Sequence, residues 1–309
     1  MSMNPRLMRP VASGVHPEAL AWKTAAVANG GQVSSTQLRA VSDLCKLVDA
    51  NGLRDRFVRL NLCCGDNVAA AVVPLYRGPS RSGTQYGNLV DTNVGPFADG
   101  ALSGYTPTGG LQGDGATRRL DIGITIGACV NAGMDYAACH LSYWWLSGGS
   151  YNGAITLGGS DIETCAYGAG LYGYSDLTQD VVSTSGDETT GGIYSAATCL
   201  SMSGATYGLH VGTRWSSGAA YSISGTDVTG GCSQDSGSPW QSSDTANSFS
   251  VMAISDLWDI PTQACNGTHY FYADGNLGMY SFGREMASSS MRAAWYTIML
   301  AFQQAIGRA

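Results

Sequence analysis

Aromatic side chains are the clearest candidates for recognition chemistry in this sequence. Six of them lie in polar, glycine-rich surroundings, where a flat ring can stack on a sugar or on a partner surface. For any single ring, packing in a core or interface is the commoner role. Trp144 and Trp145 are adjacent, so in a strand one points into the core and the other points outward, or under a helix or neighbouring subunit. The candidate contact residues are Trp144, Trp145, Tyr172, Tyr174, Trp215 and Trp240.

Two features could supply catalysis, and neither is complete. Residues 232–239 resemble the nucleophile segment of trypsin-like proteases, but two of its glycines are replaced and its partners are missing. Glycoside hydrolysis needs two carboxylates that flank the bond. The pairs Asp161/Glu163 and Asp187/Glu188 are the nearest match, and turn-capping or solvated acids explain them better. We therefore predict a protein that is not an enzyme.

The spacing of histidines and cysteines does not fit a metal site. The four histidines are far apart, and the nine cysteines contain no C-x-x-C pair. An odd cysteine count without a secretion signal indicates reduced, buried thiols, and we expect His140, His210 and His269 to be hydrogen-bonded strand residues. Calcium is the one candidate cofactor, because sandwich lectins bind it through loop oxygens. We predict no other cofactor. The loop acids that could bind calcium are Asp121, Asp135, Asp227, Asp244, Asp256 and Asp274.

The net charge of −7 is unevenly distributed along the chain. Residues 1–119 hold 12 basic and 8 acidic residues, whereas residues 120–283 hold Arg214 alone against 14 acids. Such an acidic block repels phosphates, so we exclude nucleic acid as a ligand. There is no apolar run of about 18 residues and no apolar stretch near the start of the kind that a secretory signal needs. We expect a soluble protein made in the cytoplasm, without membrane insertion.

Helix signals lie at the two ends of the chain. Pro17 opens a helix that ends near residue 29, and the capping pair Ser34/Gln37 opens a second one that ends near residue 51. Residues 291–306 carry an apolar stripe at helical spacing, after a serine-rich cap. The sequence therefore predicts an N-terminal helical hairpin and a C-terminal helix.

Between these ends the sequence is typical of β-structure. Glycine, proline, serine and threonine dominate residues 77–118, which we expect to be an irregular connection. From residue 119 to 283, short apolar runs recur between turn residues, as in antiparallel sheets closed into a sandwich or barrel. We predict a mainly β fold, an antiparallel jelly-roll β-sandwich between the helices.

Three segments together resemble a known family. They are residues 113–123 (GDGATRRLDIG), 208–214 (GLHVGTR) and 280–286 (YSFGREM). They resemble strands of the concanavalin A-like, laminin-G-like jelly rolls of phage and prophage structural proteins. This resemblance covers residues 105–309, and the earlier part resembles the helical lead-in of such proteins. It implies a lead-in and anchoring region at 1–76, an irregular linker at 77–104, and the sandwich with its terminal helix at 105–309.

The resemblance implies a virion structural protein of a phage or phage-like particle, exposed on the virion surface as head decoration, head fibre or tail component. The implied partners are other virion subunits, further copies of the chain, and a host surface glycan. Jelly rolls serve many activities, so a stand-alone lectin-like module and a glycan hydrolase with an unrecognised carboxylate pair remain alternatives. In the virion role, the residues expected to anchor the chain on a neighbour are Arg54, Arg56, Arg59, Arg77 and Arg81.

Overall fold

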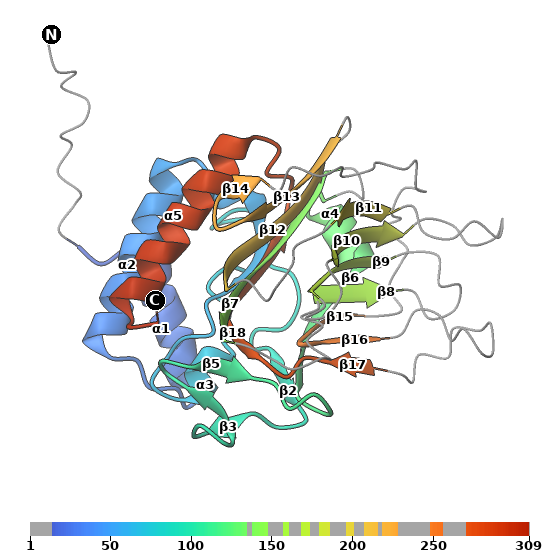
Figure 1. Ribbon diagram of the computed structural model, residues 1–309. Coiled ribbons are helices and arrows are strands. Elements are labelled where there is room, and N and C mark those ends of the chain that lie inside the picture. Colours follow the sequence, from blue (N-terminus) through green and yellow to red (C-terminus); the bar gives the residue numbers. More distant parts are fainter. Residues whose placement is uncertain are drawn as a thin grey trace, which may run out of the picture.

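In the described residues, the computed structural model has a helical layer, two large β-sheets and a small two-stranded one (Figure 1). It describes residues 14–134, 138–147, 157–160, 168–173, 179–185, 196–200, 207–215, 218–227, 248–255 and 270–308.

Three longer helices form the helical layer. α1 (Pro17–Ala28) has proline in its first turn, and α2 (Ser35–Ala50) begins after Ser34, whose Oγ accepts a hydrogen bond from the backbone N–H of Gln37. α5 (Ser289–Ala305) begins in the same way after Ser288. These starts confirm the predicted hairpin and terminal helix. In the described ranges, no helix has both the length and the apolar surface that crossing a bilayer requires.

Nine strands of the described chain form the larger sheet. They are β1 (Phe57–Asn61), β3 (Ala98–Asp99), β4 (Gly104–Thr106), β5 (Gly110–Gln112), β7 (Cys139–Ser147), β12 (Gly208–Trp215), β13 (Gly218–Ile223), β14 (Thr226–Asp227) and β18 (Asn276–Gly283). Eight of them follow the order β14-β13-β12-β7-β18-β5-β4-β3, and β1 pairs with β18. The pairs are antiparallel except for β3 with β4.

A second sheet has seven described strands. They are β2 (Thr92–Val94), β6 (Arg119–Thr125), β8 (Leu157–Ser160), β9 (Gly168–Gly173), β10 (Gln179–Ser185), β11 (Ala196–Leu200) and β15 (Ser248–Val251). Their order is β11-β10-β9-β8-β15-β6-β2, and β16 (Ala253–Ser255) pairs with β17 (Tyr270–Tyr272) beside it. The other short elements of the described residues are the 3₁₀ turn Arg54–Arg56, α3 (Val68–Ala71) and α4 (Ile126–Asn131).

The larger sheet separates two hydrophobic cores. The inner core lies between the sheets, where Phe249 of β15 stacks on Phe282 of β18 with ring centroids 5.1 Å apart. The helix-side core lies between the larger sheet and α1, α2 and α5, and Trp295 of α5 is fully buried there (Figure 1). Mainly β structure with few helices, as predicted, is thus what the chain forms.

The N-terminal region is built into the larger sheet rather than standing before it. β1 pairs antiparallel with β18, with Leu60 opposite Ser281, and the ring of Phe57 lies 4.7 Å from that of Trp295. The segment 77–104, expected to be an irregular linker, contributes β2 and β3 and the first residue of β4. β1 itself is buried on both faces, and such a strand is stable only inside a sheet.

Candidate functional site

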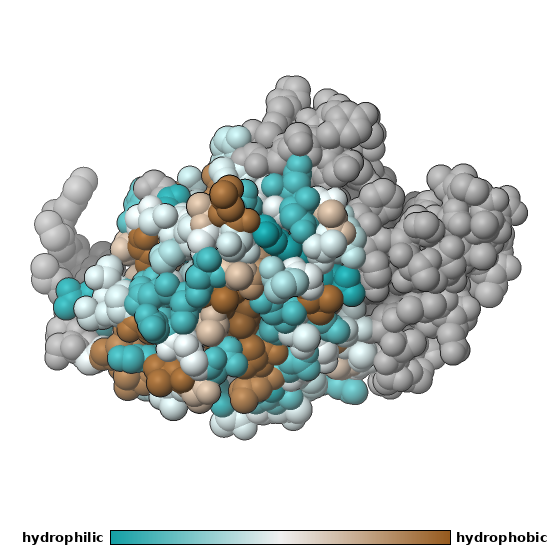
Figure 2. All heavy atoms as spheres, turned by 90° about the horizontal axis from the view of Figure 1, so that it is seen from below, coloured by the Kyte–Doolittle hydropathy of each residue, from teal (hydrophilic) through white to brown (hydrophobic). Residues whose placement is uncertain are grey.

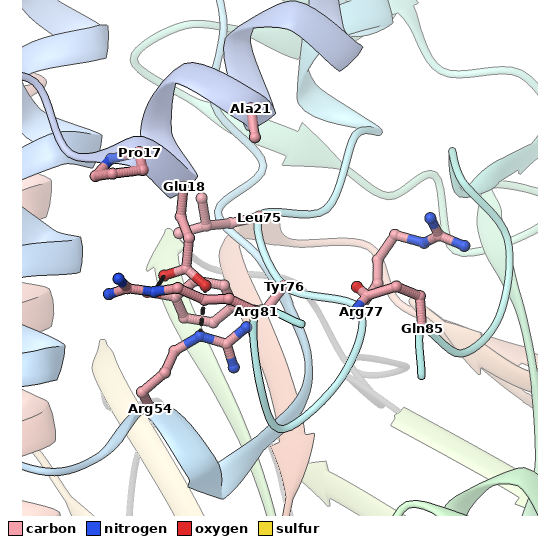
Figure 3. A pocket seen from close by; sticks show the side chains of 9 residues that line it. All are labelled: Pro17, Glu18, Ala21, Arg54, Leu75, Tyr76, Arg77, Arg81 and Gln85. Carbon is pink, nitrogen blue, oxygen red and sulfur yellow. Dashed lines mark hydrogen bonds and ion pairs between the residues drawn. The ribbon is translucent and has the colours of Figure 1, made fainter. Parts of the chain in front are cut away.

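A recess of about 290 Å³ opens where the start of α1 meets the segment that follows β1 (Figure 3). We call it the arginine recess, because three guanidinium groups line it. Its lining residues are Pro17, Glu18, Ala21, Arg54, Leu75, Tyr76, Arg77, Arg81 and Gln85.

Glu18 is the centre of the contacts in the arginine recess. It lies in the first turn of α1, and Arg54 Nε donates a hydrogen bond of 2.8 Å to its Oε1. Arg54 Nη1 donates to the carbonyl of Gly78 at 2.8 Å, and the guanidinium lies 3.8 Å from the centre of the Tyr76 ring. Arg54 is therefore fixed by an ion pair, a carbonyl and an aromatic face together.

Arg81 approaches Glu18 from a second side (Figure 3). Its Nε lies 3.3 Å from Glu18 Oε2, and its Nη2 contacts the carboxylate of Asp49 in α2. The side chain keeps 44% of its surface exposed, whereas that of Glu18 keeps 11%. Arg81 thus ties α1 and α2 to the loop that carries it and still faces solvent.

Arg77 forms the far wall of the arginine recess. Figure 3 shows its guanidinium directed away from Glu18, and its Nη2 donates to the carbonyl of Gly87 at 3.0 Å. Its Nε is buried without a hydrogen-bond partner, and burial, followed by the nearby charge of Arg59, lowers the pKa of Arg77. Gln85 Nε2 donates to the carbonyls of Ser80 and Gly83 and so holds the loop together.

Three potential metal ligands meet beside the arginine recess. Ligand atoms of His16, Glu18 and Cys45 lie within 4.8 Å of one another. Burial raises the pKa of the Cys45 thiol to about 12, and His16 Nδ1 accepts the backbone N–H of Glu18 as the cap of α1. The guanidinium groups on Glu18 repel a cation. These contacts explain the cluster as part of the helix packing.

The five predicted anchoring residues have different surroundings. Arg54, Arg77 and Arg81 meet at the arginine recess. Arg56 lies outside it, with Nη1 3.2 Å from Glu285 Oε1. The prediction is wrong for Arg59, which is 0% exposed and so has no surface for a partner.

Arg59 instead forms a buried polar network within the fold. Its Nη2 pairs with Asp91, and its Nη1 donates to the backbone carbonyls of Tyr86 and Asn88 at 3.2 and 2.9 Å. Asn61 Nδ2 and the Tyr280 hydroxyl each donate to Asp91 Oδ2 at 2.6 Å. Burial raises the pKa of Tyr280 well above its usual range, and the charge of Asp91 raises it further. The network joins β1, β18 and the segment before β2.

The predicted opposite orientation of the adjacent tryptophans is confirmed. Trp145 lies in the inner core and is 6% exposed, whereas Trp144 lies in the helix-side core and is 4% exposed. Trp144 stacks on Tyr296 of α5, with centroids 6.1 Å apart and planes 7° apart. Both rings are therefore packing residues, Trp145 in the inner core and Trp144 under the terminal helix, and neither is an exposed contact.

The other aromatic candidates contribute less to a described site. Trp215, in β12, is half-buried, with the guanidinium of Arg292 6.0 Å from its ring centre. The backbone of Tyr172 lies in β9, opposite Val181, and nothing further of that residue is described. Tyr174 and Trp240 lie outside the described residues.

A second recess of about 290 Å³ lies between α5 and the larger sheet. Trp144, Tyr207, Tyr296 and Leu300 contribute to its walls. Tyr207 is 54% exposed, which makes it the most exposed aromatic residue at this aromatic recess. Sequence patterns pointed to Trp144 but gave no signal for Tyr207 or Tyr296.

The described calcium candidates already have protein partners. Asp121 accepts hydrogen bonds from the N–H of Gly123 at 2.9 Å and from the Ser248 hydroxyl. Asp227 binds Arg292 through both oxygens, at 2.7 and 2.6 Å, and Asp274 also has a partner. The remaining acids, Asp135, Asp244 and Asp256, lie outside the described residues, as do Asp161, Glu163, Asp187, Glu188 and the segment 232–239.

The predictions for histidine and cysteine hold where they can be checked. His140 is fully buried, and its Nδ1 donates to the carbonyl of Arg284 at 2.6 Å. His210 stacks on Tyr143 with centroids 4.6 Å apart, while His269 lies outside the described residues. Within the described ranges, the buried cysteines that form no disulfide are Cys45, Cys63, Cys64, Cys129 and Cys139.

Comparison with known proteins gives distant similarity to solved structures alone. No protein-family model matches this chain, and no curated protein matches it. Among solved structures, the chain is similar to a mutant of Trypanosoma rangeli sialidase displaying trans-sialidase activity, with a TM-score of 0.40 and 9% identity. The match covers 86% of this chain and 39% of the sialidase, so the chain spans about two fifths of that protein's length.

Proposed function

We propose that this chain is a non-enzymatic structural subunit of a phage or phage-like particle, displayed on the virion surface as head decoration, head fibre or tail component. In this proposal the two sheets form a concanavalin A-like jelly roll, and the helical layer faces the particle. The observation that carries the proposal is the meeting of Arg54, Arg77 and Arg81, three of the predicted anchoring residues, at one surface recess.

The contacts within the arginine recess favour attachment over catalysis. A general base has to reach a substrate proton, yet both oxygens of Glu18 face guanidinium groups. Arginine is suited to holding a partner through planar, paired hydrogen bonds. We further propose that several copies assemble symmetrically, as most oligomers do.

Quantitative mass spectrometry of purified particles tests the structural role. We expect the chain at a fixed ratio to the major shell protein. A ratio near one indicates head decoration, and a few copies per particle indicate a tail or fibre component. If particles lack the chain, the structural role is wrong, and a free lectin or glycan hydrolase becomes the better explanation.

Glycan binding is a second candidate function, favoured by the exposed ring of Tyr207 at the aromatic recess. An aromatic ring with an open face can stack on a pyranose. A glycan array read with and without calcium tests this function. Binding that is lost in Tyr207→Ala supports it, and no binding above background argues against it.

A further inference from the structure

The arginine recess keeps hydrogen-bond donors beyond those that its internal contacts use, and we propose that it binds a carboxylate. The partner would be an acidic side chain of a neighbouring subunit. The identity of that partner rests on the proposed function, whereas the ligand chemistry follows from the recess itself.

The available donors come from all three guanidinium groups. Arg54 donates through Nε and Nη1, and Arg81 makes its contacts through Nε and Nη2. Among the described residues, Arg54 Nη2, Arg81 Nη1 and Arg77 Nη1 have no acceptor. Since Arg77 points away from Glu18, the donors lie on two walls of the recess. A carboxylate has two oxygens with which to accept from such donors.

Charge favours an anion in the recess. Three guanidinium groups line it against the single carboxylate of Glu18. Asp49 lies beyond the lining and contacts Arg81, so a positive excess remains. An anionic ligand would reduce this excess at short range, where screening by salt is weakest.

Glu18 prepares the site rather than filling it. Its two ion pairs, together with Tyr76 under Arg54, hold two long side chains in place before any ligand arrives. Ordering a free arginine on binding costs entropy, and the recess has already met most of that cost during folding. The site is therefore preorganised for its ligand.

The surface beside the recess indicates an acidic side chain with apolar neighbours. Pro17, Ala21 and Leu75 form apolar parts of its wall. On the same helix, α1, Leu20 and Val27 are 48% and 55% exposed. On the face shown in Figure 2, hydrophobic residues form separate patches among hydrophilic ones.

Titration of the full chain with acetylated hexaglutamate tests the carboxylate chemistry. Side-chain Nε–H signals of arginine, followed by NMR, should shift for Arg54, Arg77 and Arg81, and uncharged hexaglutamine of equal length should shift none of them. Arg81→Gln should weaken binding at least about tenfold, because it removes a charged donor. Arg39→Gln, an exposed arginine of α2, is the matched control and should change binding less than about twofold.

Several outcomes would overturn the assignment. Equal weakening by Arg81→Gln and Arg39→Gln would mean that only overall charge matters. Tighter binding of inorganic phosphate than of hexaglutamate would mean a phosphate site instead. If Arg81→Gln lowers the thermal stability of the chain, Arg77→Gln replaces it as the test variant, with the same expected weakening.

Particle assembly separates the failure of this inference from failure of the proposed function. We expect Arg81→Gln to lower the copy number per particle at least about fivefold, and Arg39→Gln to leave it unchanged. If both variants are incorporated like the unaltered chain, the structural role stands and the recess is not the attachment point. If no form of the chain enters particles but hexaglutamate still binds, the carboxylate site stands and the structural role is wrong.

Discussion

Arg59 shows how a single charged residue can be essential inside this fold. It is 0% exposed and pairs with Asp91, which is 1% exposed. Removing one member of a buried pair leaves the other charge without compensation, which typically costs about 3–5 kcal/mol. We expect Arg59→Met to lower the free energy of unfolding by that amount in urea denaturation.

Two further variants test that explanation. Arg56 lies three residues earlier and pairs with Glu285 at 3.2 Å, partly in solvent, so Arg56→Met should cost only about 0–1 kcal/mol. Combining Arg59→Met with Asp91→Asn should restore part of the loss, because no buried charge then lacks a partner. If the double variant is less stable than Arg59→Met alone, the explanation by an uncompensated charge fails.

His140 makes stability depend on pH. Burial lowers the pKa of its imidazole to about 4, against 6.5 for an exposed histidine. The unfolded chain therefore binds a proton at this histidine more readily than the folded chain does. The contribution of neutral His140 to the free energy of unfolding is complete above pH 6.5 and is lost as the pH falls from 6.5 towards 4. Between pH 7.5 and pH 5 the loss is about 2 kcal/mol.

Urea denaturation at those two pH values measures this effect. In His140→Asn, the difference between the two free energies of unfolding should shrink by about 2 kcal/mol. The comparison of the two chains cancels the contribution of every other titrating group. An unchanged difference would show that His140 does not titrate in this way.

At the scale of elements, β1 joins the helical layer to the sheets. Its five residues are all buried, and it pairs with β18. Deleting residues 1–61 would remove β1 together with α1 and α2, and would expose the helix-side core to water. We expect the remaining chain to aggregate or to lack a cooperative thermal transition, although the sequence alone favours an independent sandwich.

Surface variants on α1 provide the control for this deletion. Leu20→Gln and Val27→Gln change exposed positions and should leave the thermal transition within a few degrees of its original temperature. A folded, monomeric product of the deletion, with intact near-ultraviolet circular dichroism, would show that the sandwich does not need the N-terminal region.

Local sequence patterns predicted where helices and strands form better than they predicted which strands pair. Ser34 and Ser288 cap their helices as expected, and β7 and β12 form where apolar runs meet turn residues. The pairing of β1 with β18 joins segments more than 200 residues apart, and no local pattern specifies such a register.

The candidate site was predictable only in part, for a similar reason. The arginine-rich segment was visible, but an arginine in an apolar run can either face solvent or be buried with a distant acid. Arg59 is buried because it pairs with Asp91, which lies 32 residues away in the sequence. Glu18 was visible only as an acid in the first turn of a helix, and its contacts with Arg54 and Arg81 arise from tertiary packing.

At the scale of the whole molecule, the same strands build both cores. β7 places Tyr143 in the inner core and Trp144 in the helix-side core, and β18 does the same with Tyr280 and Met279. Opening either core exposes one face of these shared strands to water, and this weakens their support of the other core. We therefore expect the described parts of the chain to unfold as one cooperative unit.

Buried thiols can report on each core separately. Cys45 lies in the helix-side core and Cys129 lies in the inner core, and both are fully buried and free. Burial raises the pKa of both thiols, so each should react with a maleimide only after its core has opened. Pulse labelling across a urea series, read by mass spectrometry of the two peptides, should give one common midpoint. Separate midpoints would mean that the helical layer and the sheets unfold independently, because a shared transition exposes both thiols at the same urea concentration.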